Sequence, residues 1–218
     1  VDWDALGERL QRVANDVGRA AHPFHDSLPQ STAFDKYRTI IHGDPKQANI
    51  FLRHRRKDDD DDAEDDIGLI DFQWTGYGLA ATDVAHFICA AVHPKLLRCS
   101  QSKNDVESEL LDYYHKHLLR ELVKNSVAAT PAAAAELYPR SVLQSQYDVA
   151  VLDVCRMVFA YAWKRFRHEE TEEMTVSSLS RNSYNKKRES ALWLIVKCAD
   201  LLDRYEDEEE KEGTTFAN

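Results

Sequence analysis

Apolar residues recur at three- and four-residue intervals over most of the chain, a spacing that predicts amphipathic helices. These stripes run through residues 3–17, 80–92, 106–123, 142–166 and 184–205. The stripe at 142–166 is long and mostly apolar, so we expect it to form the buried central helix. The polar or proline-containing stretches between the stripes are expected to be loops.

Three short apolar runs, Thr39–Ile41, Ile50–Leu52 and Ile67–Ile70, interrupt the helical pattern. They are rich in β-branched or bulky residues and too short for helices, so they predict strands. A long charged stretch joins the second and third runs, which favours a β-hairpin with an acidic, disordered tip at residues 57–66. The sequence therefore predicts a mainly α fold with one small β-hairpin.

Composition supports a packed domain: 43% of the residues are hydrophobic and 30% are charged. The net charge of -10 is confined to two segments. Residues 57–66 carry eight acids against one lysine, and residues 206–212 carry six acids against one lysine. The rest of the chain is nearly neutral, which disfavours a nucleic-acid partner. Residues 206–218 have few groups that could pack and are expected to form a disordered acidic tail.

The spacing of the cysteines and the hydropathy of the chain indicate in which cellular compartment the protein is expected. The four cysteines form no CxxC pair, which favours reduced thiols in a reducing compartment and gives no zinc signature: Cys89, Cys99, Cys155 and Cys198. No apolar run approaches the roughly 20 residues that cross a bilayer. The first residues have neither the basic nor the apolar region of a signal peptide. We therefore expect a cytoplasmic protein without a membrane partner.

The candidate chemistry lies in the segment HGDPKQAN at residues 42–49 and in Asp71, which follows 22 residues after Asn49. Asn49 precedes the first strand of the predicted hairpin and Asp71 ends the second, so pairing should bring them together. An amide oxygen and a carboxylate form a usual half-site for magnesium, which phosphate and water complete. Asp44 is then left to accept a proton from a hydroxyl.

The order of base, asparagine and metal-binding aspartate is the pattern of protein-kinase-type phosphoryl transfer. Here it reads HGDxxxxN, then IDFQ, then GLAATDVAHF from residue 78. These motifs resemble the aminoglycoside phosphotransferase and choline kinase-like superfamily, and are most similar to its ecdysteroid kinase-like, or CHK kinase-like, branch. The resemblance implies a protein-kinase-like C-terminal lobe, ATP and magnesium as cofactors, and a small-molecule hydroxyl as acceptor.

The same resemblance implies roles for individual residues. Asp44 would be the catalytic base, and Asn49 and Asp71 would bind magnesium. Lys46 would contact the transferred phosphate. By analogy, two apolar side chains would flank the adenine: Phe51 and Ile70.

One feature departs from a complete kinase, which has an upstream β-lobe with a glycine-rich loop and a strand lysine. Only 41 residues precede His42, they contain no GxGxxG, and their one lysine, Lys36, is too close to the catalytic loop. The N-terminal β-lobe therefore looks to be missing, and residues 1–205 are expected to be a C-terminal lobe alone. Upstream sequence could supply the rest, and nucleotide affinity of the lobe by itself should be poor.

Two other functions compete with the kinase interpretation. A catalytically inactive lobe could act as a binding or regulatory module, whereas a metal-dependent hydrolase would need further ligands that the sequence does not offer. Residues near the motif also have structural interpretations. We expect Asp83 to cap a helix N-terminus, His42 to bond the loop backbone, and His86 to be an ordinary helix residue.

Overall fold

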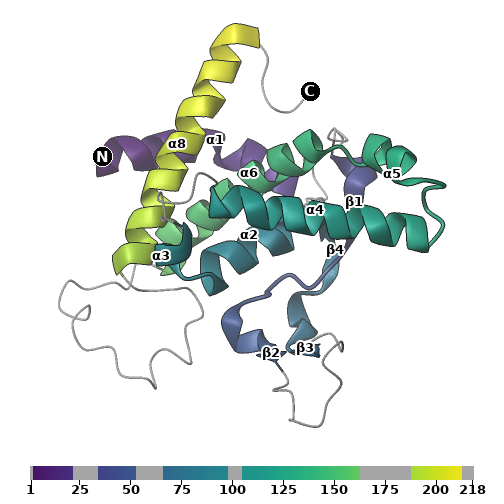
Figure 1. The fold of residues 1–218 in the computed structure, drawn as a ribbon. Coiled ribbons are helices and arrows are strands. Elements are labelled where there is room, and N and C mark those ends of the chain that lie inside the picture. The colour runs from purple at the N-terminus through teal and green to yellow at the C-terminus, as the bar shows by residue number, and fades with distance from the viewer. Residues whose placement is uncertain (1, 22–33, 53–65, 98–104, 163–187, 213–218) are drawn as a thin grey trace.

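The computed structural model describes residues 2–21, 34–52, 66–97, 105–162 and 188–212 (Figure 1). Several expectations lie wholly or mostly outside these residues: the loop after the first helix, the acidic hairpin tip, the polar segment near 168–180 and the last residues of the tail.

Helices account for most of the described residues, which confirms the mainly α fold class. The α-helices are α1 (Trp3–Ala21), α2 (Ala80–Ala91), α3 (Pro94–Leu97), α4 (Val106–Lys124), α5 (Pro131–Leu137), α6 (Arg140–Met157) and α8 (Arg188–Glu212). A π-helical turn, η4 (Val158–Ala162), continues α6, and three 3-10 turns occur at η1 (Asp35–Tyr37), η2 (Gln47–Asn49) and η3 (Phe72–Trp74). None of the helices in the described ranges is long and apolar enough to cross a bilayer.

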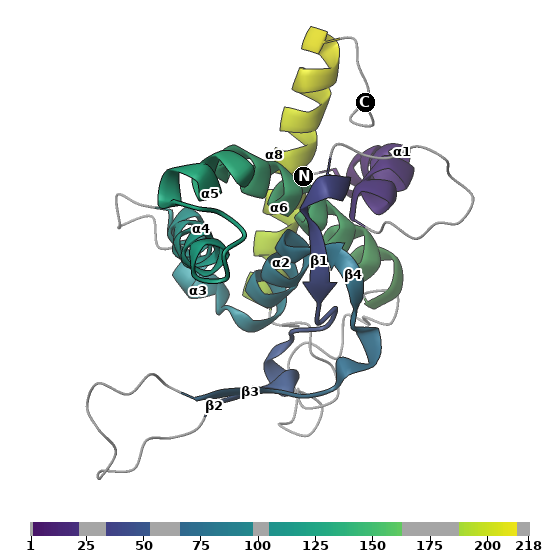
Figure 2. The same cartoon turned by 90° about the vertical axis from the view of Figure 1, so that its right-hand side faces the viewer.

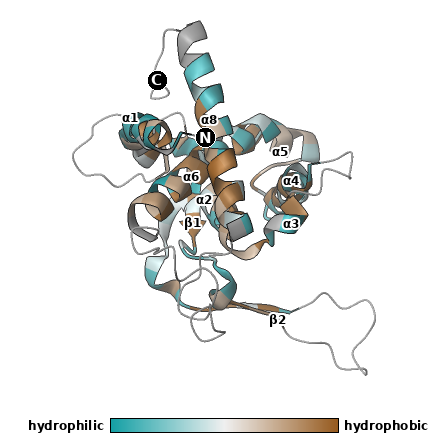
Figure 3. Ribbon diagram, turned by 90° about the vertical axis from the view of Figure 1, so that its left-hand side faces the viewer, coloured by the Kyte–Doolittle hydropathy of each residue, from teal (hydrophilic) through white to brown (hydrophobic). Residues whose placement is uncertain are grey.

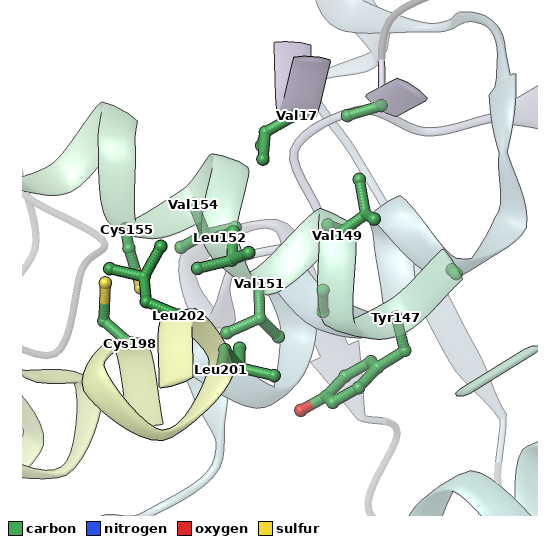
Figure 4. Packing of buried hydrophobic residues seen from close by; sticks show 14 of the residues in the cluster. Val17, Tyr147, Val149, Val151, Leu152, Val154, Cys155, Cys198, Leu201 and Leu202 are labelled. Carbon is green, nitrogen blue, oxygen red and sulfur yellow. The ribbon is translucent and has the colours of Figure 1, made fainter. Parts of the chain in front are cut away.

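The core is built around α6, as its apolar sequence predicts. Helices α1 and α2 pack against α6, and α8 crosses it (Figure 1). The apolar stripe of α1 faces this core, with buried side chains at Leu6, Leu10, Val13 and Val17. Figure 4 shows α6 side chains, among them Val151 and Leu152, meeting those of α8, and Figure 3 shows α2 and α6 as the most hydrophobic ribbons near the centre. Among the described cysteines, all are free thiols: Cys89, Cys155 and Cys198.

Helix α8 corrects the expected start of the disordered tail. It continues to Glu212, so residues 206–212 are helical. Ion pairs to α1 hold the helix at the start of this stretch: Arg9 contacts Asp203 at 2.6 Å and Glu206 at 2.8 Å. The carboxylates raise the pKa of Arg9, with the Glu206 hydrogen bond as the largest cause. Arg9 lies 194 positions before Asp203, so the composition of the tail could not reveal this partner.

Two small antiparallel sheets position the candidate motif. The predicted hairpin is confirmed as β2 (Ile50–Leu52) paired with β3 (Ile67–Leu69), and it projects away from the helices (Figure 2). The run at residue 39 is β1 (Arg38–Ile41), which pairs with β4 (Gly76–Leu79). Sequence analysis missed β4 because two glycines in four residues weaken a strand signal.

The β1–β4 ladder closes the base of the segment that carries the motif. Ile41 pairs with Gly76, so the chain leaves the ladder at residue 42 and returns to it at residue 75. The predicted catalytic loop and the hairpin both lie within this excursion. Helix α2 begins directly after β4 and packs against β1 and η2, which places it beneath the loop.

Candidate active site

Gly43 gives the loop its sharp turn. Its φ is +84°, in the left-handed region where a Cβ is strained. A Cβ at this position would also lie 2.3 Å from the carbonyl oxygen of Trp74. No side chain fits there, so the loop can approach η3 this closely only with glycine at position 43.

Asp83 fixes the loop to helix α2. Its carboxylate accepts hydrogen bonds from the backbone N–H of His42 (2.7 Å) and of Gly43 (2.9 Å). The expectation that Asp83 is an N-cap is therefore wrong: the N-cap of α2 is Leu79, without a side-chain cap, and Asp83 lies one turn further on. Its carboxylate satisfies the amides of another segment instead, through charge-assisted bonds.

His42 joins the loop to the hairpin, which confirms its expected structural role. The backbone N–H of Asp44 donates to Nδ1 at 3.3 Å, so Nδ1 is an acceptor and the ring proton is on Nε2. Nε2 then donates to the carbonyl oxygen of Ile70 at 2.9 Å. The ring is also 4.8 Å from that of Phe72, measured between centroids. One buried side chain thus contacts both the backbone of Asp44 and the residue that precedes Asp71.

The carboxylate of Asp44 is buried and held by its neighbours within the loop. Oδ2 accepts from Lys46 Nζ at 2.5 Å and from Asn49 Nδ2 at 3.3 Å. Asn49 Nδ2 also donates to the backbone carbonyl of Asp44 at 2.9 Å. Three of the residues singled out in the sequence therefore meet in one hydrogen-bonded group.

Asn49 and Asp71 lie at the open end of the hairpin, where β2 begins and β3 has ended, as the strand pattern predicts. The N–H of Ile70 donates to the carbonyl of Asn49 at 3.1 Å, one step beyond the β2–β3 ladder, and Asp71 is the next residue. Asp71 has a φ of 67°, in the left-handed region that aspartate tolerates better than most residues. It is exposed, whereas Asn49 is buried, so the pair offers one fixed and one accessible oxygen donor.

This donor set fits a hard divalent cation. Because Nδ2 of Asn49 is turned toward Asp44, its Oδ1 points away from that carboxylate. An amide oxygen and a carboxylate oxygen are donors that magnesium prefers. Among the described residues no group of three or more His, Cys, Asp and Glu could hold a metal by itself.

His86 also lies near the carboxylate of Asp44, which the sequence did not predict. It lies one turn after Asp83 on the same face of α2, and its Nε2 is 3.6 Å from Oδ1 of Asp44. Burial lowers the pKa of His86 below its ordinary value, and the neighbouring carboxylates of Asp44 and Asp83 offset only part of this effect. The ring is therefore neutral at neutral pH and lies against the oxygen of Asp44 that Lys46 does not contact.

Phe51 and Ile70 occupy one face of the hairpin. Paired residues of an antiparallel ladder share a face, and so do residues two apart in one strand. Phe51 lies two residues after Asn49, whose backbone pairs with Ile70. Both apolar side chains are about half exposed, at 55% and 48%. Both therefore leave apolar surface accessible on the hairpin.

The comparisons with known proteins agree with this geometry. A profile of the ecdysteroid kinase-like family matches residues 2–126. The chain belongs to the ecdysteroid kinase-like family. The match runs from α1 to the end of α4 and includes every site residue described above, and the family is kinase-like. No curated protein and no solved structure matches the chain.

Two residues that support the site, Asp83 and His86, were assigned ordinary helix roles in the sequence. A signal was present in their spacing. Residues three apart on a helix share a face, and this helix follows the motif after only a few residues. The spacing could not show that this face of α2 is turned toward the loop. That orientation depends on β4, which runs antiparallel to β1 and leads directly into α2.

Proposed function

We propose that this member of the ecdysteroid kinase-like family transfers the γ-phosphate of ATP to the hydroxyl group of a small molecule, with magnesium. The observation that carries the proposal is the hydrogen-bonded group of Asp44, Lys46 and Asn49, with Asp71 following the residue that pairs with Asn49. This group combines a carboxylate, a cation and two oxygen donors at one end of the hairpin.

Asp44 is the proposed base. It orients the acceptor hydroxyl and takes its proton as the oxygen attacks the phosphorus atom. Its burial and its bonds to Lys46 and Asn49 hold one carboxylate geometry, so little reorganisation is needed at the moment of reaction. Lys46, already beside Asp44, is placed to balance the charge of the transferred phosphate.

Asn49 and Asp71 are the proposed magnesium ligands. When bound, magnesium neutralises the charge of the ATP phosphates and holds them in line with the acceptor. The fixed amide of Asn49 sets one coordination direction. The exposed carboxylate of Asp71 can adjust to the nucleotide. Phe51 and Ile70 provide the apolar surface on which we propose that the adenine lies.

A binding and turnover experiment tests the proposal. Isothermal titration of Mg·ATP into the protein, with Asp71→Ala as the variant, measures the metal-nucleotide site. Release of ADP is then measured with a panel of alcohols that includes sugars, choline-like amines and sterols. Saturable binding that Asp71→Ala weakens, together with ADP release that depends on one acceptor class, supports the proposal. Absence of both contradicts it.

The second candidate is a kinase-like lobe that binds without catalysing. Part of the described surface favours it, because large apolar side chains are exposed on both sheets, among them Ile40, Tyr77 and Leu52. Exposed apolar patches mark surfaces that bind other groups or chains. Binding of Mg·ATP without acceptor-dependent ADP release, in this chain and in the chain joined to its upstream coding sequence, would favour this candidate.

A further inference from the structure

A groove of about 790 Å³ lies between β1 and helices α2, α4 and α5. All four residues of β1 line it, and among the described strands β1 pairs with β4 alone. Figure 2 shows β1 beside α2, with α4 and α5 to one side of the strand. Asp44, Asn49 and Asp71 are not among the lining residues, although Asp83, whose carboxylate accepts from the loop backbone, lines the groove as well.

Three tyrosines make part of its wall: Tyr37, Tyr114 and Tyr138. The rings of Tyr37 and Tyr138 meet edge to face, with centroids 5.1 Å apart. Burial raises the pKa of Tyr114 to about 12 and also raises that of Tyr138, so both hydroxyls are uncharged at neutral pH. With Leu118 and Leu122 of α4 the wall suits a flat apolar body.

Arg38 places a charged donor in this apolar setting. Its side chain is only 3% exposed, and Nε donates to Oδ1 of Asp35 at 2.8 Å. Nη1 is also buried, and it donates no hydrogen bond to any acceptor among the described residues. A buried guanidinium nitrogen without an acceptor is costly, because it has lost water and gained nothing in return. Arg38 is therefore prepared to receive an oxygen ligand.

The other charged groups that line the groove do not supply this acceptor. Lys36 lies over the ring of Tyr37, 4.8 Å from its centroid. Both oxygens of Asp83 already accept from the backbone of the catalytic loop. Glu136 is exposed on α5, and no bond from it to Arg38 is formed.

We propose that this groove binds a small molecule that has an apolar ring body and a carboxylate, with the carboxylate on Arg38 and the ring against the tyrosine wall. A carboxylate matches both the charge and the planar fork of a guanidinium. The proposal goes beyond the phosphotransferase function and does not depend on it, because none of the residues that carry it belongs to the proposed catalytic set.

Binding of two matched probes tests the proposal. 2-Naphthoate and its uncharged analogue 2-naphthamide are titrated into the ¹⁵N-labelled protein, and amide shifts are followed by NMR. We expect naphthoate to bind saturably, to shift amides of β1 and α4, and to bind about tenfold or more tightly than naphthamide. Inorganic phosphate, which lacks the ring, should bind much more weakly than naphthoate.

Two variants locate the anion. Arg38→Gln should abolish the preference for naphthoate over naphthamide, whereas Lys36→Gln, which removes a charge from the same groove, should change naphthoate affinity by less than about threefold. If Arg38→Gln does not fold, Leu118→Trp serves instead, because it fills the groove and should prevent naphthoate binding. Equal affinity for the two probes in the wild type, no saturable binding, or equal losses in the Lys36 and Arg38 variants would overturn the proposal.

Discussion

The Nε2–H of His42 donates to the carbonyl oxygen of Ile70, and this bond ties the loop that carries the proposed base to the strand that leads into the proposed metal ligand. The two segments are 28 residues apart in sequence. Together with the Asp83 carboxylate under the loop amides, this bond gives the site a backbone that helix α2 and strand β3 hold from two sides. The site is therefore set before any ligand arrives.

Gly43→Ala should disrupt the loop. The added Cβ meets the Trp74 carbonyl and forces a left-handed residue to carry a side chain, so we expect a loss of about 2–4 kcal/mol in the free energy of unfolding. Urea unfolding measures it. Gly7→Ala is the matched control: nothing lies within 4 Å of that Cβ, and alanine in a helix interior should stabilise by about 0.5–1 kcal/mol. Equal effects of the two substitutions would contradict the account of the loop.

Asp83→Asn should loosen the loop without changing the shape of the side chain. The asparagine amide nitrogen cannot accept, so one backbone N–H of the loop loses its partner and the other loses a charged one. We expect a loss of about 2–3 kcal/mol in the free energy of unfolding. Asp112→Asn on α4, whose carboxylate is exposed and pairs with Arg140, should cost less than about 1 kcal/mol. If Asp83→Asn lowers the free energy of unfolding by no more than Asp112→Asn does, Asp83 does not have the structural role assigned to it.

Asp44→Asn should lower kcat by about 10²- to 10⁴-fold for the acceptor that gives the fastest ADP release. The affinity for Mg·ATP should stay nearly unchanged, because Asp44 is proposed to act on the acceptor and not on the nucleotide. Calorimetry and steady-state kinetics on the same preparation separate the two quantities. A loss of nucleotide affinity that accounts for the whole loss of rate would argue against Asp44 as the base.

His86 should make stability depend on pH. Because burial lowers its pKa, the unfolded chain binds a proton at this position more readily than the folded chain does. The free energy of unfolding should therefore fall as the pH drops below the unfolded value of about 6.5. His86→Gln removes this contribution, so its free energy of unfolding should fall less than that of the wild type between about pH 7.5 and about pH 5.5. An equal or steeper fall in the variant would mean that His86 is not a buried neutral group.

The sequence predicted what depends on local pattern. The helix stripes, the hairpin and the adjacency of Asn49 and Asp71 follow from periodicity and strand pairing, and the structure confirms them. The elements that it missed depend on contacts across the chain. Strand β4 has a weak local signal and is stabilised by pairing with β1, and residues 206–212 are helical beside the arginines of α1.

The same distinction applies within the site. Asp44 and Asn49 were found because their spacing is a motif. Asp83 and His86 support that motif from a helix whose orientation only the β1–β4 ladder fixes. Arg38 gave no sequence signal at all, because its burial follows from the packing of β1 against the helices.

The central claim is that Asn49 and Asp71 bind the metal of a nucleotide complex, and paramagnetic broadening by Mn²⁺·ATP tests it most directly. Mn²⁺ takes the oxygen ligands that magnesium takes and broadens NMR signals close to it. We predict that substoichiometric Mn²⁺·ATP broadens the amide signals of Asn49, Ile70 and Asp71 before those of α5, and that excess Mg·ATP restores them. Broadening that spares residues 49 and 70–71, or that persists unchanged in Asp71→Ala, would contradict the claim.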